Sequence, residues 1–181
     1  MICNLLTRNC MRGMMAVSAD LFRDVFRRWP SGIAVVTARH DGPAHGMVIG
    51  SLCSLSATPP LVMVSAGHTS RSHDIIDGGG IFAVSILSSA QVPIFERFAG
   101  FDRAFDDDRF AGLATVEAPS GLPVFPEALA WLDCRVVARH PGEGYTIFVG
   151  EVGAASLGAS AEAAPLVYFR RQPATLAPSG S

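Results

Sequence analysis

Short apolar runs separated by polar or turn-forming residues cover most of the chain. Their length and their content of β-branched residues predict strands rather than helices. Such runs stand at 32–40, 42–60, 61–66, 81–87, 128–140, 145–157 and 165–169. Many strands with few helices favour a mainly β fold, an antiparallel barrel with a few flanking helices. Neither an internal repeat nor a linker divides the pattern, which indicates one domain.

Three segments carry helix signals instead. Ser18 can cap a helix that Pro30 ends, residues 70–77 start at a serine and run into three glycines, and residues 89–100 end at a glycine. The apolar stripe of the first helix consists of Leu21, Phe22, Val25, Phe26 and Trp29. We expect both tryptophans, Trp29 and Trp131, to be core residues.

The two ends of the chain differ from its centre. We expect residues 1–17, with methionines at 1, 11, 14 and 15, to be a disordered tail or the product of a mis-assigned start codon. Residues 173–181 are rich in Pro, Ser and Gly and predict a flexible tail. The domain is therefore expected to span 18–172.

Composition narrows the function classes. Of the 181 residues 49% are hydrophobic, which indicates a globular protein with a substantial core. A net charge of −2 and a pI near 6.2 give no electrostatic case for binding nucleic acid or an anionic membrane. The four cysteines lack C-x-x-C spacing, so we expect buried reduced thiols in a cytoplasmic protein and no zinc site. The aspartates 106–108 could bind a cation, but a solvated loop explains them better.

Residues 42–60 are unusual for a strand that only fills a core. The segment holds His45, several serines, Cys53 and the glycines Gly46 and Gly50. Small and polar residues of this kind suggest that a ligand lies against the backbone. A second polar segment, 65–74, places Ser70, Arg71 and Ser72 at a helix N-terminus, where a phosphate would find donors. A capped surface helix explains Ser70 equally well.

The order of these pieces resembles the flavin reductase-like family, whose fold is an FMN-binding split β-barrel. The likeness runs from about Phe22 to Tyr168. It rests on FRRWPSGIAVVTA, HGMVIGSLCSLSATPPLVMVSAGHTSRSHDII, GGIFAVSIL, ERFAG, ALAWLDCRVV, GEGYTIFVGEV and PLVYF. Each piece alone is common, but their number, order and spacing are specific.

The resemblance implies a set of ligand contacts. Met47, Val48, Ile49 and Gly50 would run along the flavin ring, with Ser51 turned toward the ribityl–phosphate arm. The family's other flavin contacts would fall on Ser65, Ala66, Gly67, Arg71, Ser72 and Arg97. A surface position explains Arg97 as well. The nicotinamide would meet the hairpin residues Glu143, Gly144 and Tyr145.

Two departures from the family pattern bear on function. Relatives often carry hydroxyls where Val48 and Gly50 stand, so the flavin arm loses two donors here. Many relatives have Gly-Asp-His where this chain has Glu143, Gly144 and Tyr145. A tyrosine can stack on a nicotinamide but cannot act as an acid near neutral pH. This departure affects nucleotide docking more than hydride transfer, which depends on alignment of the two rings.

The resemblance therefore implies an NAD(P)H-dependent flavin reductase that uses FMN or FAD, with NADH or NADPH as co-substrate. It also implies a homodimer and an oxygenase component that receives reduced flavin. Two alternatives stay open: an electron carrier that holds FMN tightly, and a split-barrel binding protein without turnover.

Overall fold

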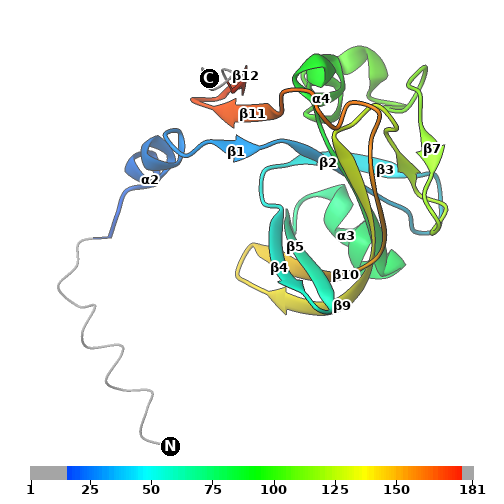
Figure 1. Cartoon of the computed structure of the whole chain (residues 1–181). Coiled ribbons are helices and arrows are strands. Elements are labelled where there is room, and N and C mark those ends of the chain that lie inside the picture. Colours follow the sequence, from blue (N-terminus) through cyan, green and yellow to red (C-terminus); the bar gives the residue numbers. More distant parts are fainter. Residues whose placement is uncertain (1–15, 177–181) are drawn as a thin grey trace, which may run out of the picture.

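The computed structural model describes residues 16–176, so most of the predicted N-terminal tail and residues 177–181 lie outside it. A seven-stranded antiparallel sheet, curled around a core, dominates the fold (Figure 1). Its strands in spatial order are β3 (His45–Ile49), β2 (Ala34–Ala38), β6 (Ile81–Ile86), β9 (Ala130–Pro141), β10 (Tyr145–Leu157), β5 (Pro60–Gly67) and β4 (Cys53–Ala57).

The sheet curls but does not close. Its two edge strands, β3 and β4, follow one another in the sequence, and only Gly50, Ser51 and Leu52 separate them. However, β3 pairs with β2 and β4 pairs with β5. The two edge strands are therefore connected by the three intervening residues and not by strand pairing with each other. This open arrangement confirms the predicted split β-barrel.

The prediction of one strand over 42–60 is wrong in detail. The chain leaves the sheet after Ile49 and re-enters it at the opposite edge at Cys53. Alternation of side chains is weak in this small-residue segment, so the pattern could not reveal the break. The other predicted strands are confirmed with small shifts of their ends. Sequence alone missed the short hairpin of β7 (Val116–Glu117) and β8 (Pro123–Val124).

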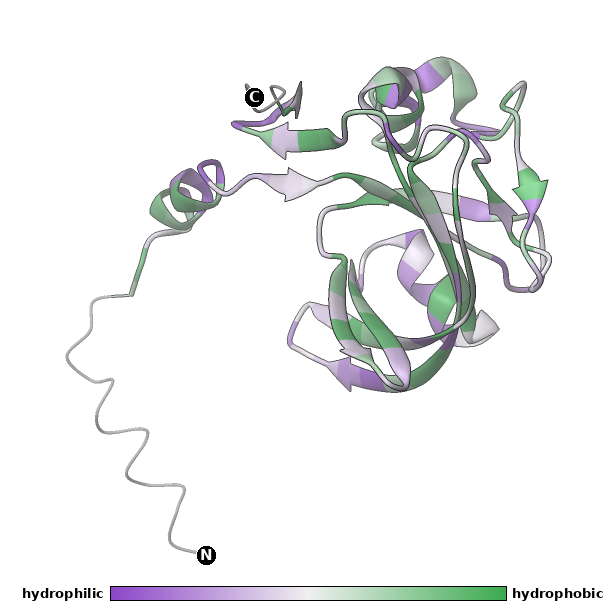
Figure 2. Ribbon diagram, viewed as in Figure 1, coloured by the Kyte–Doolittle hydropathy of each residue, from purple (hydrophilic) through white to green (hydrophobic). Residues whose placement is uncertain are grey.

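The core lies inside the curled sheet and under one of its ends (Figure 2). Val64, Phe82 and Phe148 are fully buried within the barrel, where Ile76 of a helix packs against them. A second apolar cluster includes Ile33, Val35, Phe95, Phe98 and Phe125. Three of its members, Ile33, Phe95 and Phe98, also line a surface cavity.

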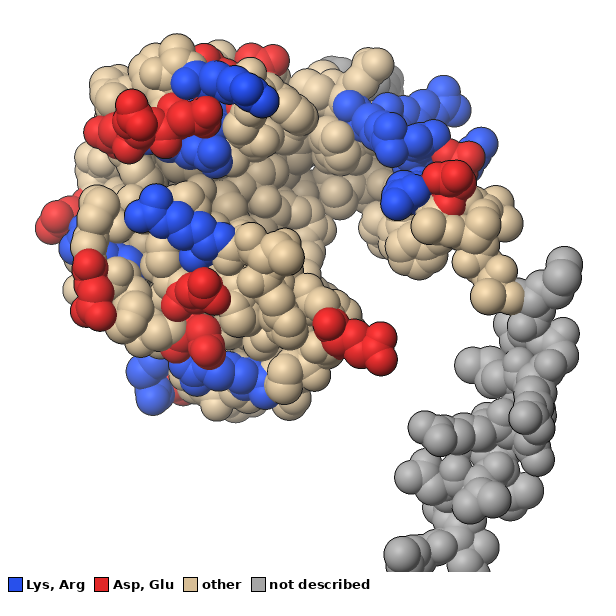
Figure 3. Space-filling model, turned by 180° about the vertical axis from the view of Figure 1, so that it is seen from behind, with Lys and Arg blue, Asp and Glu red and all other residues tan. Residues whose placement is uncertain are grey.

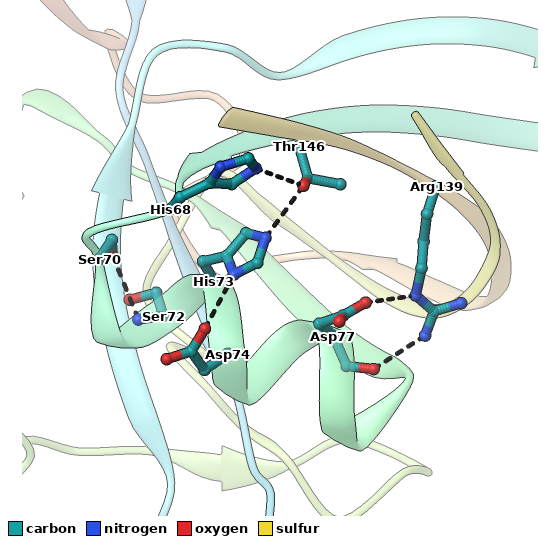
Figure 4. Close-up of polar contacts among 8 residues, drawn as sticks. All are labelled: His68, Ser70, Ser72, His73, Asp74, Asp77, Arg139 and Thr146. Atoms are coloured by element: carbon teal, nitrogen blue, oxygen red, sulfur yellow. Dashed lines mark hydrogen bonds and ion pairs between the residues drawn. The ribbon is translucent and has the colours of Figure 1, made fainter. Parts of the chain in front are cut away.

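Helix α3 (Arg71–Gly79), predicted from the signals at its two ends, packs against β2, β3, β5 and β6 (Figure 1). Ser70 caps it by accepting a hydrogen bond from the Ser72 N–H at 3.2 Å, and Gly80 ends it with a φ of +66°. Arg139 of β9 holds the helix through Asp77, with its Nε 2.6 Å from Asp77 Oδ1 and its Nη2 donating to the Asp77 carbonyl (Figure 4). Arg139 therefore fixes the C-terminal end of α3 relative to β9.

The third predicted helix, 89–100, divides into a 3-10 turn η1 (Ser89–Gln91) and α4 (Val92–Phe98). The following charged segment, predicted to be a surface loop, is largely exposed and contains only the 3-10 turn η2 (Arg103–Phe105). Within residues 16–176, no group of three or more His, Cys, Asp or Glu side chains is placed to hold a metal ion.

Helix α2 (Ala19–Phe26) projects away from the barrel (Figure 1). It is joined to the barrel through β1 (Ser31–Gly32), which pairs with β11 (Leu166–Phe169). Ser18 caps α2 as predicted, but none of its residues is buried. Trp29, just beyond it, is 69% exposed, so the prediction that it is a core residue is wrong for this chain. Trp131 is half-buried against a small apolar cluster.

The C-terminal part of the fold extends beyond the predicted domain boundary at 172. Strand β12 (Gln172–Thr175) turns back from β11 and pairs with it, so residues 173–175 are strand and not tail. Arg170 and Arg171 form the turn between them with φ values of 52° and 65°. The Arg170 N–H donates to the Arg27 carbonyl at 3.0 Å, which links this turn to the end of α2.

The two cysteines within the described residues, Cys53 and Cys134, differ in burial. Cys134 is buried, and burial raises the pKa of its thiol to about 12, so it is an unreactive core residue. Cys53 is exposed on the edge strand β4, which corrects the expectation of a buried thiol; Cys3 and Cys10 lie outside the described residues. None of the helices within 16–176 has the length and apolar character needed to span a bilayer.

Candidate functional site

Edge strand β3 forms one wall of a cavity of about 440 Å³, which we call the β3 cavity. Its lining residues are Ser31, Ile33, Met47, Val48, Ile49, Gly50, Ser70, Phe95, Phe98, Ala99, Phe101 and Tyr168. The four residues predicted to run along a flavin ring, 47–50, are thus all present. The volume falls within the usual range of small-molecule sites, about 300–1,000 Å³.

The way β3 meets this cavity suits a flat, polar-edged ligand. Successive side chains of a strand point to opposite faces, so four consecutive residues can line one cavity only if the cavity lies along the strand's edge. On that edge the backbone N–H and C=O groups of β3 have no neighbouring strand, because β3 pairs with β2 alone. These groups can hydrogen-bond a ligand as an added strand would.

Aromatic side chains form the wall opposite β3, and sequence reasoning missed them. Phe95 and Phe98 of α4 are buried against the core, while Phe101 just beyond the helix is 67% exposed at the cavity rim. Tyr168 of β11 packs near Phe95, with ring centroids 5.9 Å apart. The spacing of the three phenylalanines, three residues apart, places them on one side of a helix and could have indicated such a wall.

Gly46 in β3 and Gly50 just after it each leave room for a side chain of the protein itself. A Cβ atom on Gly46 would lie 2.3 Å from Cε1 of Phe98, and one on Gly50 would lie 2.8 Å from Ser31 Oγ. Packing against Phe98 is thus sufficient to explain the glycine at position 46, and its approach to a ligand stays a prediction. Its missing side chain makes room for the phenylalanine that forms the cavity wall.

A second, larger cavity adjoins the first and shares Met47 and Ser70 with it. This α3 cavity has a volume of about 840 Å³. Its other lining residues are Pro43, Ala44, His45, Gly46, Arg71, Ser72, Asp106, Asp107, Asp108, Arg109, Phe110, Thr115 and Pro123. The β3 cavity is mainly apolar and aromatic, whereas this one carries many charged and hydroxyl groups.

Two arginines, Arg71 and Arg109, line the α3 cavity together with His45. Burial lowers the pKa of His45, and the nearby guanidinium groups of Arg71 and Arg109 lower it further. His45 is therefore a neutral imidazole at pH 7, and the two arginines supply the charge. Arg109 also donates to the Phe98 carbonyl at 3.0 Å, which ties this cavity to the aromatic wall of the β3 cavity.

Ser72 is the observation that best fits an anionic ligand here. Its side chain is in the first turn of α3, only 4% exposed, and its Oγ has no hydrogen-bond partner. A buried hydroxyl without a partner is unfavourable and marks a place where a ligand can bind. Together with the helix N-terminus and Arg71, it fits a phosphate group. A flavin ring along β3 with its phosphate at Ser72 therefore matches the two adjoining cavities.

Ser51 and the segment 65–67 stand beside the two cavities without lining them. Ser51 Oγ accepts a hydrogen bond from the Ser65 N–H at 3.1 Å, across the opening between β3 and β5. Its own O–H proton is still available to a ligand. Ala66 is buried in the barrel core, and Gly67 is paired with Tyr145 in the sheet. The predicted flavin contacts at these positions stay predictions.

Arg97 has protein partners of its own. Its Nη1 donates to the Ala111 carbonyl at 2.7 Å, and its guanidinium carbon lies 3.4 Å from the centre of the Phe105 ring. These contacts fasten the charged loop 101–112 to α4. Arg97 lines neither cavity. Its contact with the flavin phosphate therefore stays a prediction.

Glu143 and Gly144 lie in the turn between β9 and β10, and Tyr145 begins β10, beside the loop that enters α3. The Gly144 carbonyl accepts a hydrogen bond from the His68 N–H at 3.0 Å. The Tyr145 ring is 49% exposed and packs over Gly142, where a Cβ atom would lie 2.7 Å from the ring. Tyr145 is thus an accessible aromatic surface near the α3 loop, although it lines neither cavity.

His68, in the loop before α3, and His73, in the first turns of α3, both contact the hydroxyl of Thr146 (Figure 4). His68 Nε2 and His73 Nε2 lie 3.1 and 2.9 Å from Thr146 Oγ1, and His73 Nδ1 lies 2.9 Å from Asp74 Oδ1. The Thr146 hydroxyl, with one proton to donate and lone pairs that accept, can bond to both rings at once, and Asp74 can accept a hydrogen bond from His73 Nδ1.

Comparisons with known proteins agree with this geometry. The flavin reductase like domain family matches residues 26–177. The reductase subunit HsaB of a flavin-dependent monooxygenase from Rhodococcus jostii (strain RHA1) is 34% identical over 87% of this chain and 77% of the relative. The NADH-dependent flavin reductase StyB of Pseudomonas fluorescens is 33% identical over 84% of this chain and 87% of the relative. The solved structure of flavin reductase PheA2 in its native state superposes with a TM-score of 0.79 and 31% identity, covering 89% and 99% of the two chains.

Proposed function

This chain belongs to the flavin reductase-like family, and we propose that it transfers hydride from NADH or NADPH to FMN or FAD. The observation that carries the proposal is the pair of adjoining cavities. One lies along the free edge of β3, and the other offers Arg71 and the partnerless hydroxyl of Ser72 to a phosphate. Such a site holds a molecule with a flat ring at one end and an anionic group at the other.

The protein's own contribution is binding, alignment and exclusion of water. The flavin, when bound, supplies the ring position that accepts hydride. The backbone edge of residues 47–50 would hold the ring's polar rim, and Phe101 at the cavity mouth would shield one side from solvent. The N-terminus of α3 would hold the phosphate. Alignment of two planar rings is the main rate-enhancing effect available to such a site.

We also propose that the reduced flavin is passed to an oxygenase component. Support comes from relatives named as reductase subunits of flavin-dependent monooxygenases. The rim of the β3 cavity agrees with release, because Phe101, which lines it, is itself 67% exposed. A tightly bound FMN carrier would be expected to enclose its flavin more completely.

Consumption of nicotinamide by the purified protein tests the activity. We expect NADH or NADPH absorbance to fall steadily only when FMN or FAD is added, with many turnovers for each protein molecule. Heat-inactivated protein is the control. Oxidation that stops after one equivalent would favour the carrier, and no oxidation above the control would contradict the proposal.

Tyr145 is proposed to position the nicotinamide. Tyr145→Ala is expected to raise KM for NAD(P)H about five-fold, with nearly unchanged flavin affinity, because loss of an aromatic stack costs about 1 kcal/mol. Tyr145→His should preserve or improve turnover, since many relatives of this family carry histidine there. Steady-state kinetics with each nicotinamide, together with flavin titration, measure both effects.

The competing role for Tyr145 is packing within the hairpin, over Gly142. In that case Tyr145→Ala would lower the melting temperature and leave KM unchanged. Thermal unfolding of the same variant separates the two roles. A normal KM with reduced stability would place the nicotinamide elsewhere.

We propose that the protein is a homodimer in which a second copy covers α2. Helix α2 and Trp29, three residues beyond its end, expose a stripe of apolar side chains that is larger than isolated surface apolar residues explain (Figure 2). Its members are Leu21 (56% exposed), Phe22 (57%), Val25 (57%), Phe26 (55%) and Trp29 (69%). A helix held away from its own barrel on a short strand can reach a neighbouring copy.

Replacing Phe22 and Trp29 together by serine is expected to convert the dimer to a monomer at micromolar concentration, because the stripe loses two of its three aromatic members. Light scattering measures the mass. Leu55→Ser, at an exposed apolar site on β4, is the matched control and should stay dimeric. A monomer mass for the unaltered protein would refute the dimer.

A further inference from the structure

A third cavity lies on the arm that projects from the barrel, between α2 and the turn that joins β11 to β12 (Figure 1). This α2 groove has a volume of about 240 Å³. That is the space of about eight water molecules at about 30 Å³ each, enough for a small molecule with one ring but too little for a flavin. Tyr168 of β11 lines both this groove and the β3 cavity, so a ligand here would lie one side chain away from the proposed flavin site.

Half of the residues that line the groove are aromatic. They are Phe22 and Phe26 of α2, Trp29 and Tyr168. The ring centroids of Phe22 and Phe26 lie 4.6 Å apart, and Trp29 is exposed. Aromatic side chains attract a flat ring by stacking or by edge contact. The groove therefore suits a ligand that carries an aromatic ring.

The other half of the lining is basic, and its charge is only partly neutralised. Its members are Arg23, Arg27, Arg170 and Arg171. Arg23 and Arg27 form ion pairs with Asp20 and Asp24 of α2, whereas within residues 16–176 neither Arg170 nor Arg171 forms an ion pair. Figure 3 shows basic side chains gathered on the projecting arm. The groove therefore also suits an anionic group.

Arg170 and Arg171 occupy a turn that ordinarily selects other residues. They are the two loop residues of the β11–β12 hairpin, and both have positive φ values, 52° and 65°. A two-residue hairpin loop of this kind favours asparagine and glycine, because other side chains are strained in this region. Two arginines at a strained turn that line the same groove indicate a binding role for their guanidinium groups.

Arg27 gives an independent sign of a missing ligand. Among the described residues, the buried side-chain nitrogen and oxygen atoms without a hydrogen-bond partner are Ser72 Oγ and Arg27 Nε. Arg27 Nη1 already donates to Asp24, whereas its Nε–H is left without an acceptor. A buried donor without an acceptor is unfavourable. A carboxylate matches a guanidinium best, because its two oxygens can accept two parallel hydrogen bonds.

We propose that the α2 groove binds a single-ring aromatic carboxylate, of which benzoate is the simplest. The carboxylate would accept hydrogen bonds from Arg27 and from the two arginines of the turn, and the ring would contact the aromatic half of the lining. An inorganic phosphate would leave the aromatic surface unused. An uncharged ring would leave the arginines without an anion.

The ligand and the second copy of the proposed dimer use different parts of the apolar stripe on α2. Phe22, Phe26 and Trp29 line the groove, whereas Leu21 and Val25 do not. A second copy that covers the stripe from the side of Leu21 and Val25 leaves the groove open toward the β11–β12 turn. The mass measured by light scattering should therefore be the same with and without benzoate.

Tryptophan fluorescence of the full chain measures binding directly, because Trp29 lines the groove. Trp131→Phe removes the other tryptophan, so that the signal reports on Trp29 alone. We expect benzoate to change this emission saturably, with a Kd of about 1 mM or less. Benzamide lacks the charge and acetate lacks the ring, so each should bind about ten-fold more weakly or worse.

Replacing Arg170 by Asn and Arg171 by Gly in one variant tests the role of the turn. These residues suit the backbone there, so we expect the melting temperature to stay the same or rise. The Kd for benzoate should nevertheless rise about ten-fold or more, because two cations are lost. Arg28→Gln, near the same end of α2 but outside the groove, is the matched control and should leave the Kd within two-fold.

Three results would overturn the inference. One is the same benzoate affinity in the unaltered protein and in the double variant. Another is equal affinity for benzoate, benzamide and acetate, which would indicate non-specific quenching. The third is no saturable response to millimolar benzoate in the unaltered dimer, as expected if the second copy itself fills the groove. Flavin titration of the same variants reports on the proposed function separately, because none of the substituted residues lines the β3 or α3 cavity.

Discussion

Arg71→Ala is expected to weaken flavin binding by about 1.5 to 3 kcal/mol, roughly 10- to 150-fold in Kd. Arg71 begins α3 and lines the α3 cavity beside the buried Ser72 hydroxyl. A guanidinium that meets a phosphate makes charge-assisted hydrogen bonds, which are stronger than neutral ones. Because Arg71 is exposed to solvent, we expect the lower part of this range.

Flavin fluorescence quenching measures this effect with FMN and with riboflavin, which lacks the phosphate. The loss should appear with FMN and be nearly absent with riboflavin, because only the phosphate contact is removed. Arg103→Ala serves as the control for a change of surface charge. An unchanged Kd for FMN would place Arg71 outside the binding site.

Gly46→Ala is expected to destabilise the flavin-free protein by about 1 to 3 kcal/mol, the usual cost of overpacking. The new Cβ atom would lie 2.3 and 2.6 Å from two ring carbons of Phe98. That ring cannot move away easily, because it is 2% exposed and packs against Phe110 and Phe125 at centroid distances of 5.0 and 5.8 Å. The melting temperature should fall by about 2 to 12 °C for a chain of this size.

Gly32→Ala is the matched control, because a Cβ atom at Gly32 in strand β1 would meet nothing within 4 Å. Thermal unfolding of both variants without flavin gives the comparison. If Gly46 instead provided access for a ligand, Gly46→Ala would unfold like the original protein and lose only flavin affinity. That result would support the interpretation suggested by the sequence, that a ligand lies against this glycine.

Local signals predicted the elements of this fold well. Ser18 and Ser70 both cap helices as their positions indicated, and Gly80 ends α3. The long runs at 128–140 and 145–157 became the paired strands β9 and β10. Each of these signals lies within a few residues of the feature it predicts, so no knowledge of distant contacts was needed.

Features that depend on distant contacts could not be predicted from pattern. Gly46 is explained by Phe98, 52 residues away, and the histidine cluster exists because Thr146 of β10 lies opposite the start of α3. Trp29 was expected in the core because it belongs to an apolar stripe. Such a stripe predicts burial, but it does not distinguish burial in the chain's own core from burial against a second copy. Among the site residues, Arg71 and Ser72 line a cavity as expected, whereas Arg97 is bound to its own loop.

Anaerobic stopped-flow mixing of the protein with excess flavin and each nicotinamide tests the central claim most directly. The account predicts that all of the flavin is bleached, at a rate proportional to protein concentration, so that each protein molecule reduces many flavins. Bleaching limited to one flavin per protein molecule would contradict it and identify an electron carrier. Bleaching no faster than in the absence of protein would leave a flavin-binding protein without turnover.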